Sequence, residues 1–169
     1  MVNKIILAAQ FARGCHSGQL RKYTGRPYIT HPARVAARVS IHNVATTDLV
    51  CAAWLHDTIE DCDVTASDLE TRFGETVANL VIDMTNTSKA SGENRAKRKQ
   101  MDRDRIAAVC RDAKILKLVD RIDNLMEIDR DSDFAKTYAQ ESILLAGVLE
   151  DADTELFDEL NSVAYSILG

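Results

Sequence analysis

The sequence has little proline and glycine, few aromatic residues and no long apolar run. Its 169 residues include two prolines and seven glycines, so long uninterrupted helices can form. Runs of β-branched and aromatic residues with a period of two are scarce, and none of them predicts a strand. No apolar run approaches the roughly 20 residues of a transmembrane helix, so no membrane partner is expected. These absences favour an all-α globular protein.

Positive charge is also in the minority. The chain carries 21 Lys and Arg against 26 Asp and Glu, which gives a net charge of −5. Proteins that bind nucleic acid generally need a basic footprint to displace counterions, so we expect no nucleic-acid partner. A chain of this length can bury a sizeable core, and no internal repeat or linker divides it. We therefore predict a single domain over residues 1–169.

The four cysteines indicate a reducing cellular compartment rather than a zinc-binding site. None of the four belongs to a CxxC pair or to another zinc-binding spacing. Free thiols are typical of a reducing compartment, so we predict a cytoplasmic protein. Residues 1–7 begin an amphipathic helix rather than a signal peptide, because Gln10 and Arg13 soon interrupt the apolar positions.

Hydrophobic periodicity predicts a series of helices joined by short loops. The first spans about 3–13 and ends at Gly14, the second starts at Pro32, and the third starts near Thr47 and continues through His56 and Asp57. Thr65 and Asp68 resemble a capping box for a fourth helix. The remaining helices are predicted at about 75–84, 95–110, 113–129, 134–150 and 153–168. The expected fold is an all-α, compact bundle with irregular helix packing.

The end of the third predicted helix carries an unusual concentration of ionisable groups, in the run His56-Asp57-Thr58-Ile59-Glu60-Asp61. In helical geometry His56 and Glu60 share a face, and Asp57 lies beside both Glu60 and Asp61. Three carboxylates this close repel one another unless a cation neutralises them. A divalent metal bound by His56 and Asp57 would do so. Glu60 and Asp61 could then orient or deprotonate a water molecule.

The alternative interpretation is a solvated, charged helix end. Negative charge at a helix C-terminus is unfavourable because of the helix dipole. The cluster therefore lowers the stability of the helix end and has no obvious structural role. This cost favours a functional interpretation of the run.

A metal site of this kind needs about four to six ligands, so other segments must contribute. His31 precedes Pro32 at a predicted helix start and can project into a cleft. Asp120 and Asn124 lie one turn apart on a predicted core helix. A carboxylate among apolar residues should be either metal-bound or paired, and for Asp120 a salt bridge with Lys117 or Arg121 remains the alternative.

The ordered set of His31, His56-Asp57 and Asp120 resembles the four-ligand site of the HD-domain metal-dependent phosphohydrolases. Further segments resemble the RelA/SpoT hydrolase domain and the small stand-alone alarmone hydrolases. These segments are Phe11-Ala12-Arg13 with His16, Gly18-Gln19-Leu20-Arg21-Lys22, Pro27-Tyr28-Ile29-Thr30-His31-Pro32, the HDxxED run 56–61, Phe73-Gly74 and Lys117-Leu118-Val119-Asp120-Arg121-Ile122-Asp123-Asn124.

This resemblance implies an HD-domain fold and one Mn²⁺ ion bound by His31, His56, Asp57 and Asp120. It also implies hydrolysis of guanosine 3′,5′-bis(diphosphate) at its 3′-pyrophosphate, giving GDP and pyrophosphate. The carboxylates that match the family's catalytic pair are Glu60 and Asp61. The residues that match its substrate contacts are Arg21, Lys22, Asn124 and, by a looser alignment, Tyr138.

The substrate would be strongly anionic while the protein is acidic, so local cations must receive the phosphates. The segment 95–105, with six basic residues, is a candidate, and a solvated helix face of mixed charge is its alternative. Asp123 stands where family members often have an aromatic residue or histidine. This difference could affect recognition of the base or the phosphates.

Two other functions remain open from the sequence. One is hydrolysis of another nucleotide, such as an adenosine alarmone or the 2′-phosphate of NADPH. The other is a non-catalytic nucleotide sensor, which the retention of Glu60, Asp61 and Asn124 disfavours. The sequence is compatible with a homo-oligomer.

Overall fold

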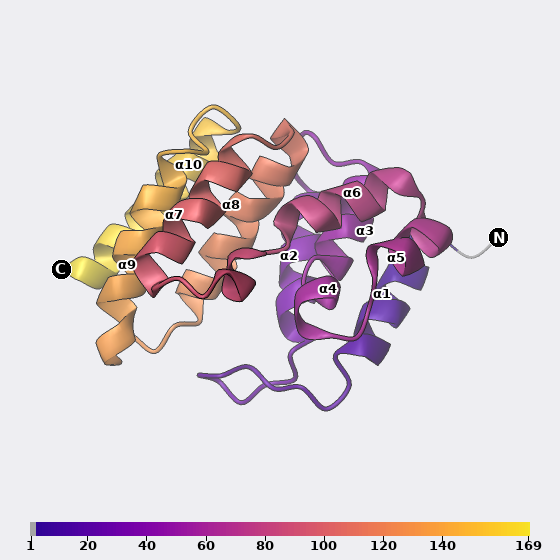
Figure 1. Cartoon of the computed structure of the whole chain (residues 1–169), viewed down its shortest axis with the longest axis horizontal. Coiled ribbons are helices and arrows are strands. Elements are labelled where there is room, and N and C mark those ends of the chain that lie inside the picture. Colours follow the sequence, from indigo (N-terminus) through magenta and orange to yellow (C-terminus); the bar gives the residue numbers. More distant parts are fainter. Residues whose placement is uncertain (1–2) are drawn as a thin grey trace. The chain divides into compact units, whose positions relative to one another are not determined.

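The computed structural model describes residues 3–169, so Met1 and Val2, the start of the predicted amphipathic segment, lie outside it. The described chain contains ten α-helices and one short 3-10 helix, coloured along the sequence in Figure 1. Within residues 3–169 no strand is formed, and Leu20 and Pro27 make an isolated β-bridge. None of the described helices is long and apolar enough to cross a membrane. The all-α prediction is confirmed.

The chain divides into two compact units, of which the first ends at Thr85. Its helix α3 packs against α1, α2 and α6, while α5 packs against α6. Six of the nine α3 residues are buried, so this helix forms the centre of the unit's core. The six helices are α1 (Lys4–Cys15), α2 (Thr30–Ser40), α3 (Thr47–Leu55), α4 (Thr58–Asp61), α5 (Ala66–Phe73) and α6 (Glu75–Met84).

Local hydrogen bonds set the helix ends of the first unit. The predicted capping box is present at α5: the Thr65 hydroxyl accepts from the Asp68 N–H, and the Asp68 carboxylate accepts from the Thr65 N–H. Gly74 ends α5 with φ of 82°, a value that favours glycine. The first helix differs from its prediction. It continues through Gly14 to Cys15, because the His16 N–H still bonds to the Ala12 carbonyl at 3.0 Å.

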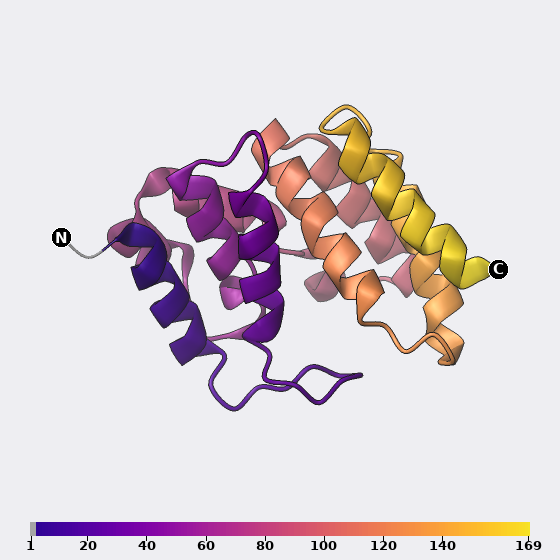
Figure 2. The same ribbon diagram turned by 180° about the vertical axis from the view of Figure 1, so that it is seen from behind.

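The second unit runs from Asn86 to the end of the chain. Helix α8 packs against α7, α9 and α10, and α9 packs against α10, an arrangement visible from behind in Figure 2. Twelve of the sixteen α8 residues are buried, which makes this helix the centre of the second core. The elements are the 3-10 helix η1 (Ser88–Ser91), α7 (Arg95–Ala107), α8 (Arg111–Met126), α9 (Asp133–Ala146) and α10 (Thr154–Leu168).

Candidate metal centre

Three of the four predicted metal ligands converge in the first unit. The Nε2 atoms of His31 and His56 are 3.2 Å apart. The Oδ2 atom of Asp57 lies 3.5 Å from His31 Nε2 and 3.1 Å from His56 Nε2. All three potential ligand atoms lie within 4.8 Å of one another. We call His31, His56 and Asp57 the ligand triad.

A break between two helices creates this geometry. The prediction that the third helix continues through His56 and Asp57 is wrong: α3 ends at Leu55, and α4 starts at Thr58. The buried Thr58 hydroxyl donates to the Leu55 carbonyl at 2.7 Å, and His56 Nδ1 contacts the Ala53 carbonyl at 2.8 Å. These bonds satisfy carbonyl groups of the last turn of α3, which an ending helix leaves without intrahelical partners.

The same break prepares the His56 ring for a ligand. Because a carbonyl oxygen only accepts, the hydrogen bond to Ala53 places the proton on Nδ1 and leaves the Nε2 lone pair facing the triad. Metal-binding histidines are usually oriented in this way by a carbonyl or a carboxylate. His56 is 2% exposed, so its ring has little freedom to turn away.

His31 and Asp57 are also held by their surroundings. Helix α2 starts at Thr30 rather than at the predicted Pro32, so the fully buried His31 side chain belongs to its first turn. The Tyr28 hydroxyl donates to Asp57 Oδ2 at 2.7 Å. Two imidazole nitrogens and one carboxylate oxygen form a donor set that suits a divalent transition metal. The triad therefore fits a divalent metal ion.

The two predicted catalytic acids lie on the helix that follows the triad. Glu60 is half-buried and Asp61 is exposed, both on the four-residue helix α4. Asp61 is tied to the preceding turn, because its N–H bonds to the Asp57 carbonyl at 2.9 Å. Its Oδ2 atom accepts a hydrogen bond from Gln19 Nε2 at 3.1 Å.

The predicted basic pair lies in the loop between α1 and α2. The Arg21 guanidinium stacks over the Tyr28 ring at 5.3 Å, and the Lys22 ammonium lies 5.1 Å from the centre of the Tyr23 ring. The Arg21 N–H bonds to the Arg26 carbonyl at 2.8 Å, which closes a narrow hairpin. Arg21 thus contacts Tyr28, whose hydroxyl bonds to Asp57 of the triad, whereas Lys22 is exposed.

The fourth predicted ligand, Asp120, belongs to the second unit and lies on α8. It is 5% exposed and accepts from Lys117 Nζ at 3.0 Å, which is one of the two salt bridges considered from the sequence. Asn124 Nδ2 donates to Asp120 Oδ1 at 2.6 Å, one helical turn away as predicted. A lysine and an amide therefore fix the orientation of this carboxylate. Asp123, the departure from the family pattern, is also buried on α8.

The remaining predicted substrate contact, Tyr138 on α9, packs beneath a buried arginine. The Arg121 guanidinium lies 4.5 Å from the centre of the Tyr138 ring, and Arg121 Nη1 donates to the Ser142 hydroxyl at 3.3 Å. The Arg121 Nε atom has no hydrogen-bond partner in the described part of the chain.

A second effect of Arg121 concerns Lys99 on α7. Burial and the nearby Arg121 charge lower the pKa of the Lys99 ammonium.

Two of the six basic residues in the segment 95–105 pair with nearby acidic residues. Arg95 forms a bidentate pair with Glu141 at 2.7 and 2.8 Å, and Lys99 contacts Asp102 at 3.4 Å. These contacts favour the interpretation of the segment as a helix face of mixed charge.

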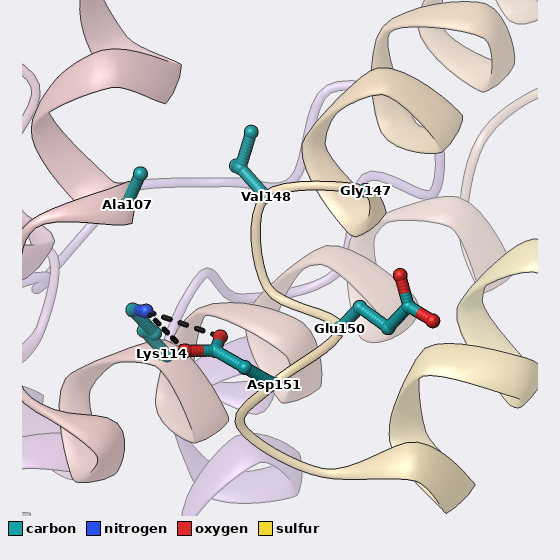
Figure 3. A pocket seen from close by; sticks show the side chains of 6 residues that line it. All are labelled: Ala107, Lys114, Gly147, Val148, Glu150 and Asp151. Atoms are coloured by element: carbon teal, nitrogen blue, oxygen red, sulfur yellow. Dashed lines mark hydrogen bonds and ion pairs between the residues drawn. The ribbon is translucent and has the colours of Figure 1, made fainter.

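An open pocket of about 570 Å³ in the second unit contains none of the predicted site residues. Figure 3 shows its central feature, an ion pair between Lys114 Nζ and the Asp151 carboxylate at 2.9 and 3.1 Å. The lining consists of Ala107, Lys114, Gly147, Val148, Glu150 and Asp151. Because its lysine is already paired with an acid in its own wall, this pocket offers little to an anionic ligand.

Sequence reasoning assigned no role to three residues that the structure places around the triad. Tyr28 bonds to Asp57, while His16 and Gln19 form a chain of contacts to Asp61. All three belong to motifs quoted for the family resemblance. Asp57 lies 29 residues from Tyr28 and Asp61 lies 42 residues from Gln19, so periodicity could not identify these contacts.

Comparisons with known proteins find related sequences and structures. Residues 8–149 match the family described as HD domain. The human guanosine-3′,5′-bis(diphosphate) 3′-pyrophosphohydrolase MESH1 is 37% identical over 130 residues, which cover 75% of this chain and 70% of that protein. The enzyme of the same activity from Aquifex aeolicus is 39% identical over 120 residues, which cover 70% of this chain and 17% of that longer protein.

A solved structure also matches nearly the whole chain. It is described as a metazoan ortholog of SpoT that hydrolyses ppGpp and plays a role in starvation responses. The TM-score is 0.82 at 25% sequence identity, and the match covers 98% of this chain and 96% of that one.

Proposed function

The chain belongs to the HD-domain family, and from that premise we propose that it is a metal-dependent guanosine-3′,5′-bis(diphosphate) 3′-pyrophosphohydrolase. The observation that carries this proposal is the ligand triad, whose imidazole and carboxylate donors meet within 4.8 Å. The activity named for the human and Aquifex aeolicus relatives supports the choice of substrate. The family match crosses the boundary between the two units, which supports one functional domain over residues 1–169.

We assign Mn²⁺ to a site made by the triad together with Asp120. A divalent ion supplies Lewis acidity that polarises a phosphoryl oxygen and offsets its developing charge. The support for Asp120 is its place in the family motif and its orientation by Lys117 and Asn124. Mixed nitrogen and oxygen ligands suit Mn²⁺ as well as other divalent ions, so metal identity is part of the test.

In the reaction, water attacks the phosphorus bonded to the 3′-oxygen and the bond between that phosphorus and the 3′-oxygen breaks. GDP leaves with a proton on its 3′-hydroxyl, and pyrophosphate is the second product. We assign removal of the water proton to Glu60 and Asp61, which follow the triad on α4.

We assign binding of the nucleotide to Arg21, Lys22, Asn124 and Tyr138. Two of these are cations on the α1–α2 loop, where charge-assisted hydrogen bonds to phosphate are strong. The Arg21 guanidinium is oriented by its stacking on the Tyr28 ring, and Tyr28 also bonds to Asp57. Tyr138 offers an aromatic ring whose position is fixed by Arg121.

We also propose a cytoplasmic location. The four free cysteines support a reducing, cytoplasmic compartment.

The test is to incubate the Mn²⁺-loaded protein separately with guanosine 3′,5′-bis(diphosphate), its adenosine counterpart and NADPH, and to identify the products by ion-exchange chromatography. GDP with pyrophosphate is the expected result. Orthophosphate from NADPH, with no product from either alarmone, would contradict the proposal.

Two variants test the assignment of roles. Glu60→Gln should retain Mn²⁺ binding and lose about 100-fold or more in kcat, the range expected for a general base. Glu70→Gln on α5 is the matched control, because Glu70 is an exposed helical glutamate. Asp120→Asn should weaken Mn²⁺ binding in a calorimetric titration. Unchanged affinity in that variant would remove Asp120 from the ligand set.

A further inference from the structure

A buried histidine outside the ligand triad is connected to the catalytic end of α4. We propose that His16 is a positioning residue, which fixes the Asp61 carboxylate through the side-chain amide of Gln19. This inference rests on the proposed function for the role of Asp61. It adds a role for His16, a motif residue to which sequence reasoning assigned none. It is carried by a relay of two hydrogen bonds and by the burial of the His16 ring.

The relay fixes the proton on one ring nitrogen. Gln19 Nε2 donates to Asp61 Oδ2 at 3.1 Å, which places the Gln19 carbonyl oxygen toward His16. That oxygen, Oε1, lies 2.6 Å from His16 Nδ1. Since an amide oxygen only accepts, Nδ1 must carry the proton. His16 therefore donates to Gln19, and Gln19 donates to Asp61.

The second ring nitrogen shows that this arrangement has a cost. His16 is 3% exposed, and its Nε2 atom has no hydrogen-bond partner among residues 3–169. A buried polar atom without a partner is unfavourable, whereas an apolar side chain would fill the same volume without that penalty. The polar function of His16 must then come from Nδ1, which is the atom that bonds to Gln19.

The surroundings hold the ring in place. The Tyr28 ring stacks on His16 with centroids 4.8 Å apart and an interplanar angle of 28°. The sulfur of Cys62, the residue after α4, lies 3.5 Å from His16 Nδ1. The backbone adds a turn, because the Gln19 N–H bonds to the His16 carbonyl at 3.1 Å. Gly18 permits this turn with φ of 80°.

Asp61 needs such a constraint more than its neighbours do. It is exposed and ends a helix of four residues, so packing does not select one rotamer. A carboxylate that removes a proton must lie within hydrogen-bond reach of the attacking water, and a displacement of about 1 Å can reduce a rate about 100-fold. The relay from His16 supplies the constraint that packing does not.

The deciding experiment compares kcat and KM for guanosine 3′,5′-bis(diphosphate) in four single variants of the Mn²⁺-loaded chain. His16→Leu fills the cavity but has no donor, and Gln19→Leu removes the relay from a half-buried position. Both should reduce kcat about 10- to 100-fold with little change in KM. His16→Asn places an amide N–H near the position of Nδ1 and should recover most of that loss. Gln10→Leu, an exposed glutamine on α1, is the matched control.

A purely structural role makes the opposite prediction. If His16 only fills space, the apolar His16→Leu variant should be at least as active as His16→Asn, and Gln19→Leu should retain the kcat of the native chain. The double variant His16→Leu/Gln19→Leu should lose no more than either single variant if the two residues act in one relay. Independent losses that multiply in the double variant would overturn the proposal.

A measurement without substrate separates this inference from the proposed function. Nitrogen-15 NMR of the metal-free chain should show His16 with its proton on Nδ1, and Gln19→Leu should alter that signal. A proton on Nε2 would overturn the relay whatever the activity. An inactive native chain with the Nδ1 proton in place would instead overturn the assigned substrate, leaving the relay supported as a structural feature.

Discussion

Replacing Tyr28 with phenylalanine should weaken metal binding while leaving all three triad residues in place. The Tyr28 hydroxyl donates to Asp57 Oδ2 at 2.7 Å, and its ring stacks on His16. Phenylalanine retains the ring and removes only the hydroxyl. The variant therefore removes the hydroxyl that donates to a proposed ligand and keeps the ring.

The magnitude follows from the charge of the acceptor. A hydrogen bond to a charged group contributes about 1.5–3 kcal/mol. At about 1.4 kcal/mol per factor of ten, its loss corresponds to roughly 10- to 140-fold weaker binding if the bond matters fully in the metal-bound state. Loss of a group that orients a metal ligand typically reduces affinity by about 10- to 100-fold, so both routes give the same range.

Isothermal titration calorimetry with Mn²⁺ measures this effect directly. Tyr165→Phe is the matched control, because Tyr165 is 59% exposed on α10 and should show unchanged affinity. In an Asp57→Asn background the Tyr28→Phe substitution should have little further effect, since the charged acceptor is then absent. Native affinity in the single variant Tyr28→Phe would refute the reasoning that Tyr28 orients Asp57 for a metal.

Three further predictions concern the chain outside the triad. Leu118→Ala on α8 should lower the free energy of unfolding by about 2–5 kcal/mol in urea denaturation, because the side chain is fully buried; a loss below about 1 kcal/mol would contradict this packing. The Thr65 hydroxyl lowers the pKa of Asp68 below its ordinary value of 3.8, so Asp68 stabilises the fold above that pH. Asp68→Asn should therefore melt at a lower temperature than the native chain at pH 7, with the difference shrinking as the pH falls below 3.8, and a difference that stays constant would disprove the linkage. Burial raises the pKa of the Cys62 thiol to about 11, so iodoacetamide at pH 8 should modify the exposed Cys110 first, as read by mass spectrometry; equal rates would be the contrary result.

Helix type and approximate position could be predicted from the sequence because the signals are local. The Thr65 and Asp68 capping box is one example, since both partners lie within a single turn and the structure contains both hydrogen bonds. The break after Leu55 could not be predicted in the same way. Apolar residues continue up to that point, and the side chains of His56 and Thr58 turn back onto α3 only in the folded chain.

The candidate site shows the same division. The approach of His31 to His56 and Asp57 was predictable because the ordered motif resembles a known ligand set, and the structure brings these three together. Hydrogen bonds such as the one from Tyr28 to Asp57 depend on how a loop is placed against a helix end. Neither composition nor periodicity encodes such a placement. Asp120, in the second unit, stays a prediction as the fourth ligand.

The narrow hairpin that carries Arg21 and Lys22 can accept substitutions during evolution without disturbing the buried residues beside it. Residues 22–27 are exposed, whereas the histidines on either side of the loop, His16 and His31, are buried. Exposed segments with few packed neighbours open at little free-energy cost, so amide hydrogens at the tip should exchange with solvent long before the His31 amide does. Under the proposed assignment of Arg21 and Lys22 to the nucleotide, substitutions or insertions at the tip would alter which nucleotide is preferred while the proposed metal ligands stay in place.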